Sequence, residues 1–246
     1  MTAEGPAPAS KPAPGQPTAE KVRGIFGNIA ARYDLLNLLM SFGVDRHWRR
    51  VTVRLAGLTP ESEALDLCAG TGDLTLALAS QGRPAAVTGT DFVPEMLEVA
   101  ERKLARYDGS ADVSFSIADA QDLPFPDARF DVVTVAFGVR NLPDRAANFR
   151  EVLRVLRPGG RYLILEFSTP PNRLFRGLVR MYDRVVVPFL GGLVAGDRAS
   201  YQYLNDSILA FPDQEALAVE LRAAGFSAVS WSDLTGGVVA VHVAVK

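Results

Sequence analysis

The chain has 246 residues, of which 48% are hydrophobic and 22% charged, as is ordinary for a soluble globular protein. This length fits one α/β domain with an appendage, and a net charge of −2 gives no electrostatic case for nucleic acid as the main partner. A single cysteine, Cys68, excludes an intrachain disulfide, and two histidines leave too few ligands for a His/Cys metal site, so we expect no metal.

Residues 1–19 are rich in proline and alanine and lack apolar periodicity, so we expect a disordered tail. The tail contains no apolar segment before a cleavage site, as a secretory signal would. The longest strongly apolar run, residues 185–195, contains Pro188 and is too short to span a bilayer. The sequence therefore predicts a cytoplasmic protein.

Residues 20–56 carry apolar side chains at helical spacing, most clearly at Val22, Ile25, Phe26 and Ile29. They precede the first predicted strand of the chain. We therefore expect them to form a helical cap outside the sheet.

A glycine turn follows a short predicted strand at residues 64–68 and opens a helix. Gly70 and Gly72 allow the backbone to bend sharply and leave room for a ligand. A second strand, residues 85–90, ends at Asp91, about 20 residues after the loop, where a carboxylate can bind two ribose hydroxyls. Strand, glycine loop, helix, strand and acid together predict a nucleoside-binding βαβ unit.

The glycine loop departs from the dinucleotide pattern G-x-G-x-x-G, because Thr75 stands where the third glycine would be. An acidic strand residue ahead of the loop, Asp66, favours S-adenosylmethionine instead. This nucleoside carries no phosphate, and its sulfonium and amino groups are attracted to carboxylates. The alternative is an αβ turn that binds no ligand.

Strands and helices alternate through the rest of the chain, which implies a parallel sheet. Helices are predicted at residues 145–156, ended by Pro158-Gly159-Gly160, and at residues 213–224. A hairpin around Thr235-Gly236-Gly237 makes the last strand antiparallel to its neighbour. The further predicted strands are residues 113–118, 130–137, 161–167, 228–234 and 238–245. A mainly parallel, seven-stranded α/β sheet with a C-terminal antiparallel hairpin matches the Rossmann-like class I methyltransferase fold.

Residues 170–212 lie outside this alternation, and we expect a helical insertion. Arginines recur there at three- and four-residue spacing, on one helix face: Arg173, Arg176, Arg180 and Arg184. A basic amphipathic helix can lie on an anionic membrane surface. A solvated helix face over the core explains the same pattern, and the sequence favours neither reading.

Four segments between about residue 20 and the C-terminus carry a family resemblance: residues 26–37 (FGNIAARYDLLN), 65–73 (LDLCAGTGD), 135–141 (VAFGVRN) and 233–242 (DLTGGVVAVH). The chain resembles the quinone-biosynthesis C-methyltransferases, which methylate demethylmenaquinol and, in some organisms, the related ubiquinone precursor. The last two segments narrow the resemblance to this family, since the glycine loop indicates only a methyltransferase. The resemblance implies one methyltransferase domain over residues 20–246 that C-methylates demethylmenaquinol in menaquinone biosynthesis.

The resemblance also implies contacts with S-adenosylmethionine at Thr71, Asp91, Asp119 and Ala120, beside Asp66, Gly70 and Gly72 of the βαβ unit. Some family members that serve both quinones carry serine where this chain has Ala136. That departure tilts the expected substrate toward the menaquinone precursor.

Methylation of a quinol ring carbon requires in-line attack on the sulfonium methyl and loss of a phenolic proton. Arg140 and Asn141 follow the fourth predicted strand, at the carboxyl edge of the sheet where ligands bind. Arg140 stays protonated, so we expect it to steady the phenolate or to orient a water. A surface ion pair is the alternative role for Arg140. Tyr33 in the cap is expected to cover the quinol, and a structural role is the alternative for this residue.

Two other functions stay open. One is methylation of another small or lipid acceptor, including the benzoquinol precursor of ubiquinone, and the other is a non-catalytic protein that binds the cofactor. Intact Asp66, Gly70, Gly72 and Asp91 argue against the second. The expected partners are a prenylated naphthoquinol, the inner face of a membrane through peripheral contact, and a second copy of the chain.

Overall fold

The structure is a computed structural model and describes residues 19–182 and 198–246. The predicted tail, apart from its last residue, and Arg184 of the basic helix lie outside the described residues. Within the described ranges, no helix combines the length and the apolar character needed to cross a membrane.

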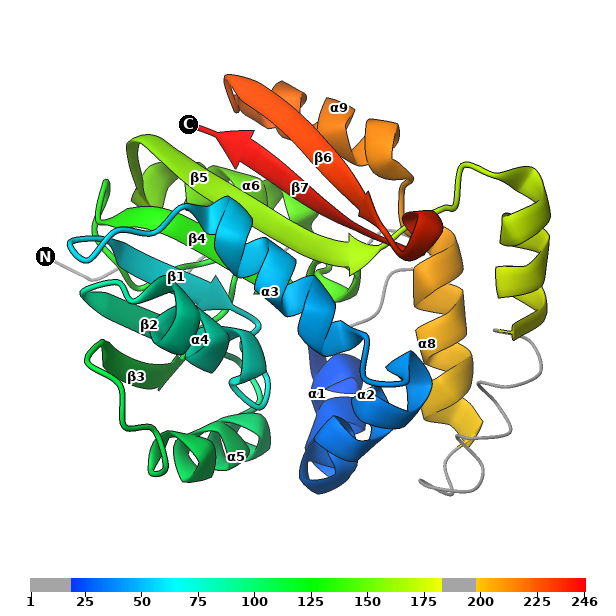
Figure 1. Cartoon of the computed structure of the whole chain (residues 1–246), viewed down its shortest axis with the longest axis horizontal. Helices are drawn as coiled ribbons and strands as arrows, with labels where there is room; N and C mark the ends of the chain where they lie inside the picture. Colours follow the sequence, from blue (N-terminus) through cyan, green and yellow to red (C-terminus); the bar gives the residue numbers. More distant parts are fainter. Residues whose placement is uncertain (1–18, 183–197) are drawn as a thin grey trace, which may run out of the picture.

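Seven strands form one sheet in the order β3-β2-β1-β4-β5-β7-β6 (Figure 1). Their bounds are β1 Glu63–Leu67, β2 Ala86–Asp91, β3 Asp112–Ile117, β4 Phe130–Ala136, β5 Leu156–Phe167, β6 Ala228–Leu234 and β7 Val239–Val245. Strands β1 to β5 pair in parallel, and β7 lies between β5 and β6, antiparallel to both. The predicted mainly parallel sheet with its C-terminal antiparallel hairpin is confirmed.

The fifth strand begins earlier than predicted. Helix α6 (Arg145–Val155) ends where β5 begins, and Leu156 already pairs with Phe130 of β4. The Pro158-Gly159-Gly160 segment therefore lies inside the strand, where the pairing register shifts, and Gly159 has a φ of +77°. Proline and glycine allow this irregularity in β5, which lies between two other strands of the sheet. The prediction that they separate the helix from the strand was wrong.

Successive side chains of the central strands point to opposite faces of the sheet, and each face has its own core. Helices α6 and α9 (Gln214–Ala224) cover one face, where Phe149, Leu217 and Leu221 pack on β1, β4 and β5. Helices α3 (Asp45–Ala56) and α4 (Asp73–Ala77), with the π-helical turn Leu78–Gly82 that follows α4, cover the other. Figure 1 shows α3 lying across this second face.

The cap comprises α1 (Ala19–Ile29), a 3₁₀ turn (Ala30–Arg32), α2 (Tyr33–Ser41) and α3. Figure 1 shows α1, α2 and α8 (Arg198–Ala210) beyond the carboxyl ends of the central strands. A further helix covers residues 173–182, within the predicted insertion. Helix α5 (Pro94–Leu104), with proline in its first turn, was not predicted.

A hydrogen bond joins the cap to the far end of the chain. The indole Nε1–H of Trp48 in α3 donates to Thr235 Oγ1 in the β6–β7 turn at 2.8 Å. The Leu-Thr-Gly-Gly segment that carried part of the family resemblance therefore holds the cap in place.

Candidate functional site

The two glycines of the loop after β1 have different structural roles. Both have positive φ, +55° at Gly70 and +80° at Gly72. A Cβ at Gly72 would lie 2.9 Å from the ring of Phe115 and 3.0 Å from Ala100, so this glycine allows helix α5 to pack closely. A Cβ at Gly70 would meet nothing nearer than 4.0 Å, because this residue faces a cavity. Gly70 is therefore the glycine that leaves room for a ligand.

Asp91 ends β2 and is nearly buried, at 7% exposure. Its Oδ2 accepts a hydrogen bond from the backbone N–H of Gly70 at 2.8 Å, and its Oδ1 accepts one from Val93 N–H at 2.9 Å. Burial raises the pKa of this carboxyl, although the backbone donors act in the opposite direction. Asp91 thus fixes the glycine loop to the turn after β2 while lining the same cavity.

A cavity of about 70 Å³ lies at this edge of the sheet. It brings together four of the predicted cofactor residues from three strand ends: Gly70, Asp91, Asp119 and Ala120. Asn141 lines it as well. Because parallel strands end at a common edge, these residues meet although the sequence spreads them over some 70 positions (70 to 141).

Asp66 and Thr71 do not line this cavity. The Asp66 carboxylate is 1% exposed and accepts hydrogen bonds from the hydroxyls of Thr75 at 2.6 Å and Thr134 at 2.7 Å. Burial raises the pKa of Asp66 to about 6 despite these two donors. Thr71 is also buried, and its hydroxyl donates to Asp34 Oδ1 at 2.6 Å.

Asp66 should make stability depend on pH. An unfolded aspartate titrates near 3.9, so between about pH 4 and pH 6 the folded state binds more protons, and stability falls as pH rises. Asp66→Asn should therefore gain stability relative to the parent on going from pH 4.5 to pH 7, by roughly 2 kcal/mol. Urea unfolding of both proteins at the two pH values measures this difference. An equal stability difference between the two proteins at both pH values would show that folding does not raise the pKa of Asp66.

A second, apolar cavity of about 170 Å³ adjoins the first. Its walls come from the cap, the segment after β4, the end of β5 and α8, and include Leu36, Met40, Trp48, Phe167 and Ile208. Three aromatic residues line both cavities: Phe26, Tyr33 and Phe137. These rings form the boundary at which a ligand in one cavity would meet a ligand in the other.

Arg140 lines the apolar cavity and forms a buried ion pair. Its Nη1 lies 2.9 Å from Oε1 of Glu166, with side-chain exposures of 4% and 1%. The guanidinium also donates to the carbonyl of Phe137 and lies over the ring of Phe167. Its Nε is buried without a hydrogen-bond partner. The alternative of a surface ion pair is therefore wrong, because both charges lie inside the protein.

The other two predicted catalytic residues lie close by. Asn141 donates from Nδ2 to Phe137 O at 3.3 Å and accepts at Oδ1 from the Tyr203 hydroxyl at 2.9 Å. Burial raises the pKa of the Tyr33 phenol, and Arg140 partly opposes this. Burial likewise raises the pKa of Tyr203 to about 12. Both phenols therefore keep their protons at neutral pH.

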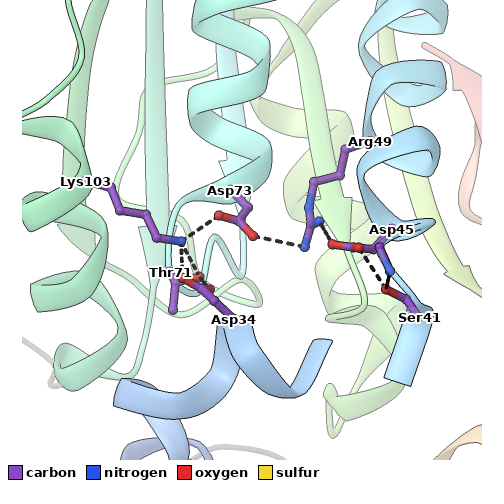
Figure 2. Close-up of polar contacts among 8 residues, drawn as sticks. Asp34, Ser41, Asp45, Arg49, Thr71, Asp73 and Lys103 are labelled. Atoms are coloured by element: carbon purple, nitrogen blue, oxygen red, sulfur yellow. Dashed lines mark hydrogen bonds and ion pairs between the residues drawn. The ribbon is translucent and has the colours of Figure 1, made fainter. Parts of the chain in front are cut away.

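Several polar residues at the site were missed in the sequence. Glu166 stands one residue from the end of β5, and an acid directly after the apolar run of residues 162–165 is a signal that could have found it. Lys103 of α5 and Arg49 of α3 were also missed. They belong to a charged network drawn in Figure 2, in which Lys103 contacts Asp34 of α2 and Asp73 of α4, both at 2.6 Å. Helical periodicity alone gives no indication of such contacts.

Comparisons with known proteins agree with this geometry. The family model described as the ubiE/COQ5 methyltransferase family matches residues 16–246. The demethylmenaquinone methyltransferase of Thermus thermophilus is 50% identical over 219 residues, covering 89% of this chain and 98% of that protein. The ubiquinone/menaquinone biosynthesis C-methyltransferase UbiE of Stutzerimonas stutzeri is 44% identical over 237 residues, 96% of this chain and 93% of that protein.

Solved structures share the fold at low sequence identity. A Thermotoga maritima protein described as an S-adenosylmethionine-dependent methyltransferase and possible histamine N-methyltransferase superposes with a TM-score of 0.62 at 20% identity. The match covers 91% of this chain and 99% of that one. The class I methyltransferase fold is therefore confirmed.

Proposed function

Because the chain belongs to the ubiE/COQ5 methyltransferase family, we propose that it transfers a methyl group from S-adenosylmethionine to a ring carbon of demethylmenaquinol, giving menaquinol. The observation that carries this proposal is the meeting of two cavities. One is lined by the acids of the strand ends and the other is apolar and holds Arg140, with three aromatic rings between them. The pair suits a nucleoside donor beside an aromatic acceptor.

S-adenosylmethionine supplies an electrophilic methyl group on its sulfonium. Asp91 would accept hydrogen bonds from the ribose hydroxyls, since each carboxylate oxygen has two acceptor sites and the backbone donors occupy one on each. Asp119 and Ala120 would flank the ligand, and Gly70 would give its backbone room to approach. Asp66, Thr71 and Gly72 would contribute to cofactor binding indirectly, by maintaining the conformation of the glycine loop.

The quinol ring would lie in the apolar cavity with a phenolic oxygen toward Arg140. Loss of the phenolic proton raises electron density at the attacking carbon, and a fixed positive charge stabilises the phenolate. Tyr33, on the boundary between the cavities, would hold the ring against the methyl group, where alignment supplies much of the rate. Asn141 would support this arrangement from the segment after β4.

The cap (residues 20–56) and the described parts of the insertion (residues 170–182 and 198–212) would close the acceptor cavity within a single domain. Residues of α1, α2 and α3 line that cavity, as do Tyr182 and residues of α8. The apolar lining suits a prenylated naphthoquinol.

Incubation with labelled S-adenosylmethionine and a short-chain demethylmenaquinol, kept reduced, tests the proposal. We expect label in menaquinol and an equal amount of S-adenosylhomocysteine. Absence of product from a folded protein that binds S-adenosylmethionine would support the non-catalytic alternative.

The benzoquinol precursor of ubiquinone is the competing acceptor, because the name of the Stutzerimonas relative includes both quinones. Ala136, which tilts the proposal toward the naphthoquinol, lines the cavity that contains Asp91 and Asp119. Faster methylation of the benzoquinol in direct competition would reverse this choice of substrate.

Peripheral membrane contact through the basic helix is part of the proposal. Arg173 and Arg180 are exposed, while Arg176 donates to the carbonyls of Pro170 and Pro171. Exchanging Arg173 and Arg180 for glutamine should weaken co-sedimentation with anionic vesicles about 30-fold, from roughly 1 kcal/mol per charge. In the matched control, two other exposed arginines are exchanged for glutamine: Arg102 in α5 and Arg106 just after this helix. Equal losses in the two variants would favour a solvated helix face.

A further inference from the structure

Asp45 and Arg49 stand between the apolar cavity and an open polar groove. The groove, of about 580 Å³, runs along α2, α3 and α4, and both residues line the groove as well as the cavity. The rest of the cavity wall is mostly apolar and aromatic. This pair is thus a polar connection between the acceptor cavity and the groove.

The Asp45 carboxylate is held in place from two sides. It is the first residue of α3 and is 7% exposed. The hydroxyl of Ser41, which also lines the cavity, donates to Asp45 Oδ1 at 2.8 Å, and the guanidinium of Arg49 pairs with Oδ2. Figure 2 shows this pair continuing through Asp73 to Lys103.

Asp45 is ionised at neutral pH. Burial raises the pKa of the carboxyl, but the donors Ser41 and Arg49 outweigh it and hold the pKa below its ordinary value. An aspartate in this state has vacant acceptor sites for a proton.

The proposed reaction releases a proton inside the cavity. The O–H electron pair stays on oxygen as the phenolate forms, a ring π pair forms the carbon–carbon bond, and the sulfur–carbon pair stays on sulfur. The methylated ring carbon then loses its hydrogen as a proton, which restores the aromatic ring. The phenolic oxygen takes up a proton again. Each turnover therefore leaves one proton that has to reach solvent.

We propose that Asp45 accepts the proton released by the quinol through the Ser41 hydroxyl and passes it to water in the polar groove. This inference rests on the proposed function. Among the described residues that line the apolar cavity, Asp45 is the sole carboxylate. Arg49 and Arg140 offer hydrogen-bond donors and no acceptor site. His47, the histidine of the cap, is exposed and is not among the cavity-lining residues.

The test is single-turnover methyl transfer to a short-chain demethylmenaquinol across pH. Asp45→Asn should lower the rate at pH 7 by about 100-fold, the lower end of what general acid–base catalysis supplies. The rate of Asp45→Asn should rise with pH, because the quinol loses its proton to solvent more readily at high pH. In Asp45→Ala, added formate should restore part of the lost rate. Ser41→Ala should show a smaller loss with the same change in pH profile. S-adenosylmethionine affinity should change little in each.

Asp73→Asn is the matched control, because it removes a carboxylate from the same network but none from the cavity wall. Its rate should keep the parent's pH dependence. The other charged and titratable groups in this comparison lie along the groove (Asp34, Arg46, Arg49, Arg50, Asp73 and Lys103), in the cavity wall (Tyr33, Arg140, Tyr182 and Tyr203) and beside Arg140 (Glu166).

Parent turnover is measured first, so that absence of product counts against the proposed function alone. With an active parent, a folded Asp45→Asn whose rate matches the parent, or falls equally at every pH, overturns this inference. If Asp45→Asn fails to fold, Ser41→Ala decides: a parent-like pH profile overturns the proton route.

Discussion

Replacing Arg140 with leucine should lower the rate of methyl transfer by about 100-fold or more, the loss typical of removing one preorganised donor. The guanidinium is buried at the apolar cavity, where a phenolate gains more from a fixed charge than it would in water. The interaction is stronger in the transition state than with the neutral quinol, so the loss should fall on kcat. Single-turnover kinetics with saturating S-adenosylmethionine measures it.

The same substitution leaves Glu166 buried without its partner, which should cost about 3–5 kcal/mol of stability. The double variant Arg140→Leu, Glu166→Leu removes both charges and should regain much of that stability without regaining rate. Arg140→Lys keeps a charge but loses the paired guanidinium geometry, so it should be intermediate. A double variant that transfers methyl at the parental rate would remove Arg140 from the mechanism.

Asp91→Ala should weaken S-adenosylmethionine binding by at least about tenfold. Hydrogen bonds to a charged group contribute about 1.5–3 kcal/mol each, and the two ribose hydroxyls would lose theirs. The backbone N–H groups of Gly70 and Val93 would also lose their acceptor, so the glycine loop would be held less firmly. Titration calorimetry reports the affinity directly.

Two further variants isolate the Asp91 effect. Asp91→Asn keeps one amide oxygen as an acceptor and should lose less affinity than the alanine variant. Asp108→Ala removes an exposed acid near the end of α5 and should bind as the parent does. Parental affinity in a folded Asp91→Ala would contradict the assignment of the ribose site.

Gly70, Asp91 and Asp119, which the sequence assigns to the cofactor, line one cavity because strand ends of a parallel sheet share one edge. The sequence did not predict that the Asp66 carboxylate accepts hydrogen bonds from Thr75 and Thr134, because the side-chain partners of a buried strand depend on strand register. Similarly, Glu166 follows Arg140 by 26 positions, and only the pairing of β4 with β5 brings them together.

The helices around the site were harder to predict than the strands. Three helices of the cap were expected as one helical region, and α5 was missed although Pro94 marks its first turn. The ion pairs of Lys103 join α5 to α2 and α4, and such contacts follow from packing rather than from local sequence.

The place of β7 in the sheet has a consequence for the order in which the protein can be made. This strand is the last of the chain, yet it lies between β5 and β6, and the turn before it receives the Trp48 hydrogen bond. A ribosome delivers the strand ends of the donor cavity, residues 70–120, about 120 residues before Thr235 and β7. The nascent chain can therefore assemble its nucleoside side early, while the wall of the acceptor side waits until Thr235 and β7 have been synthesised.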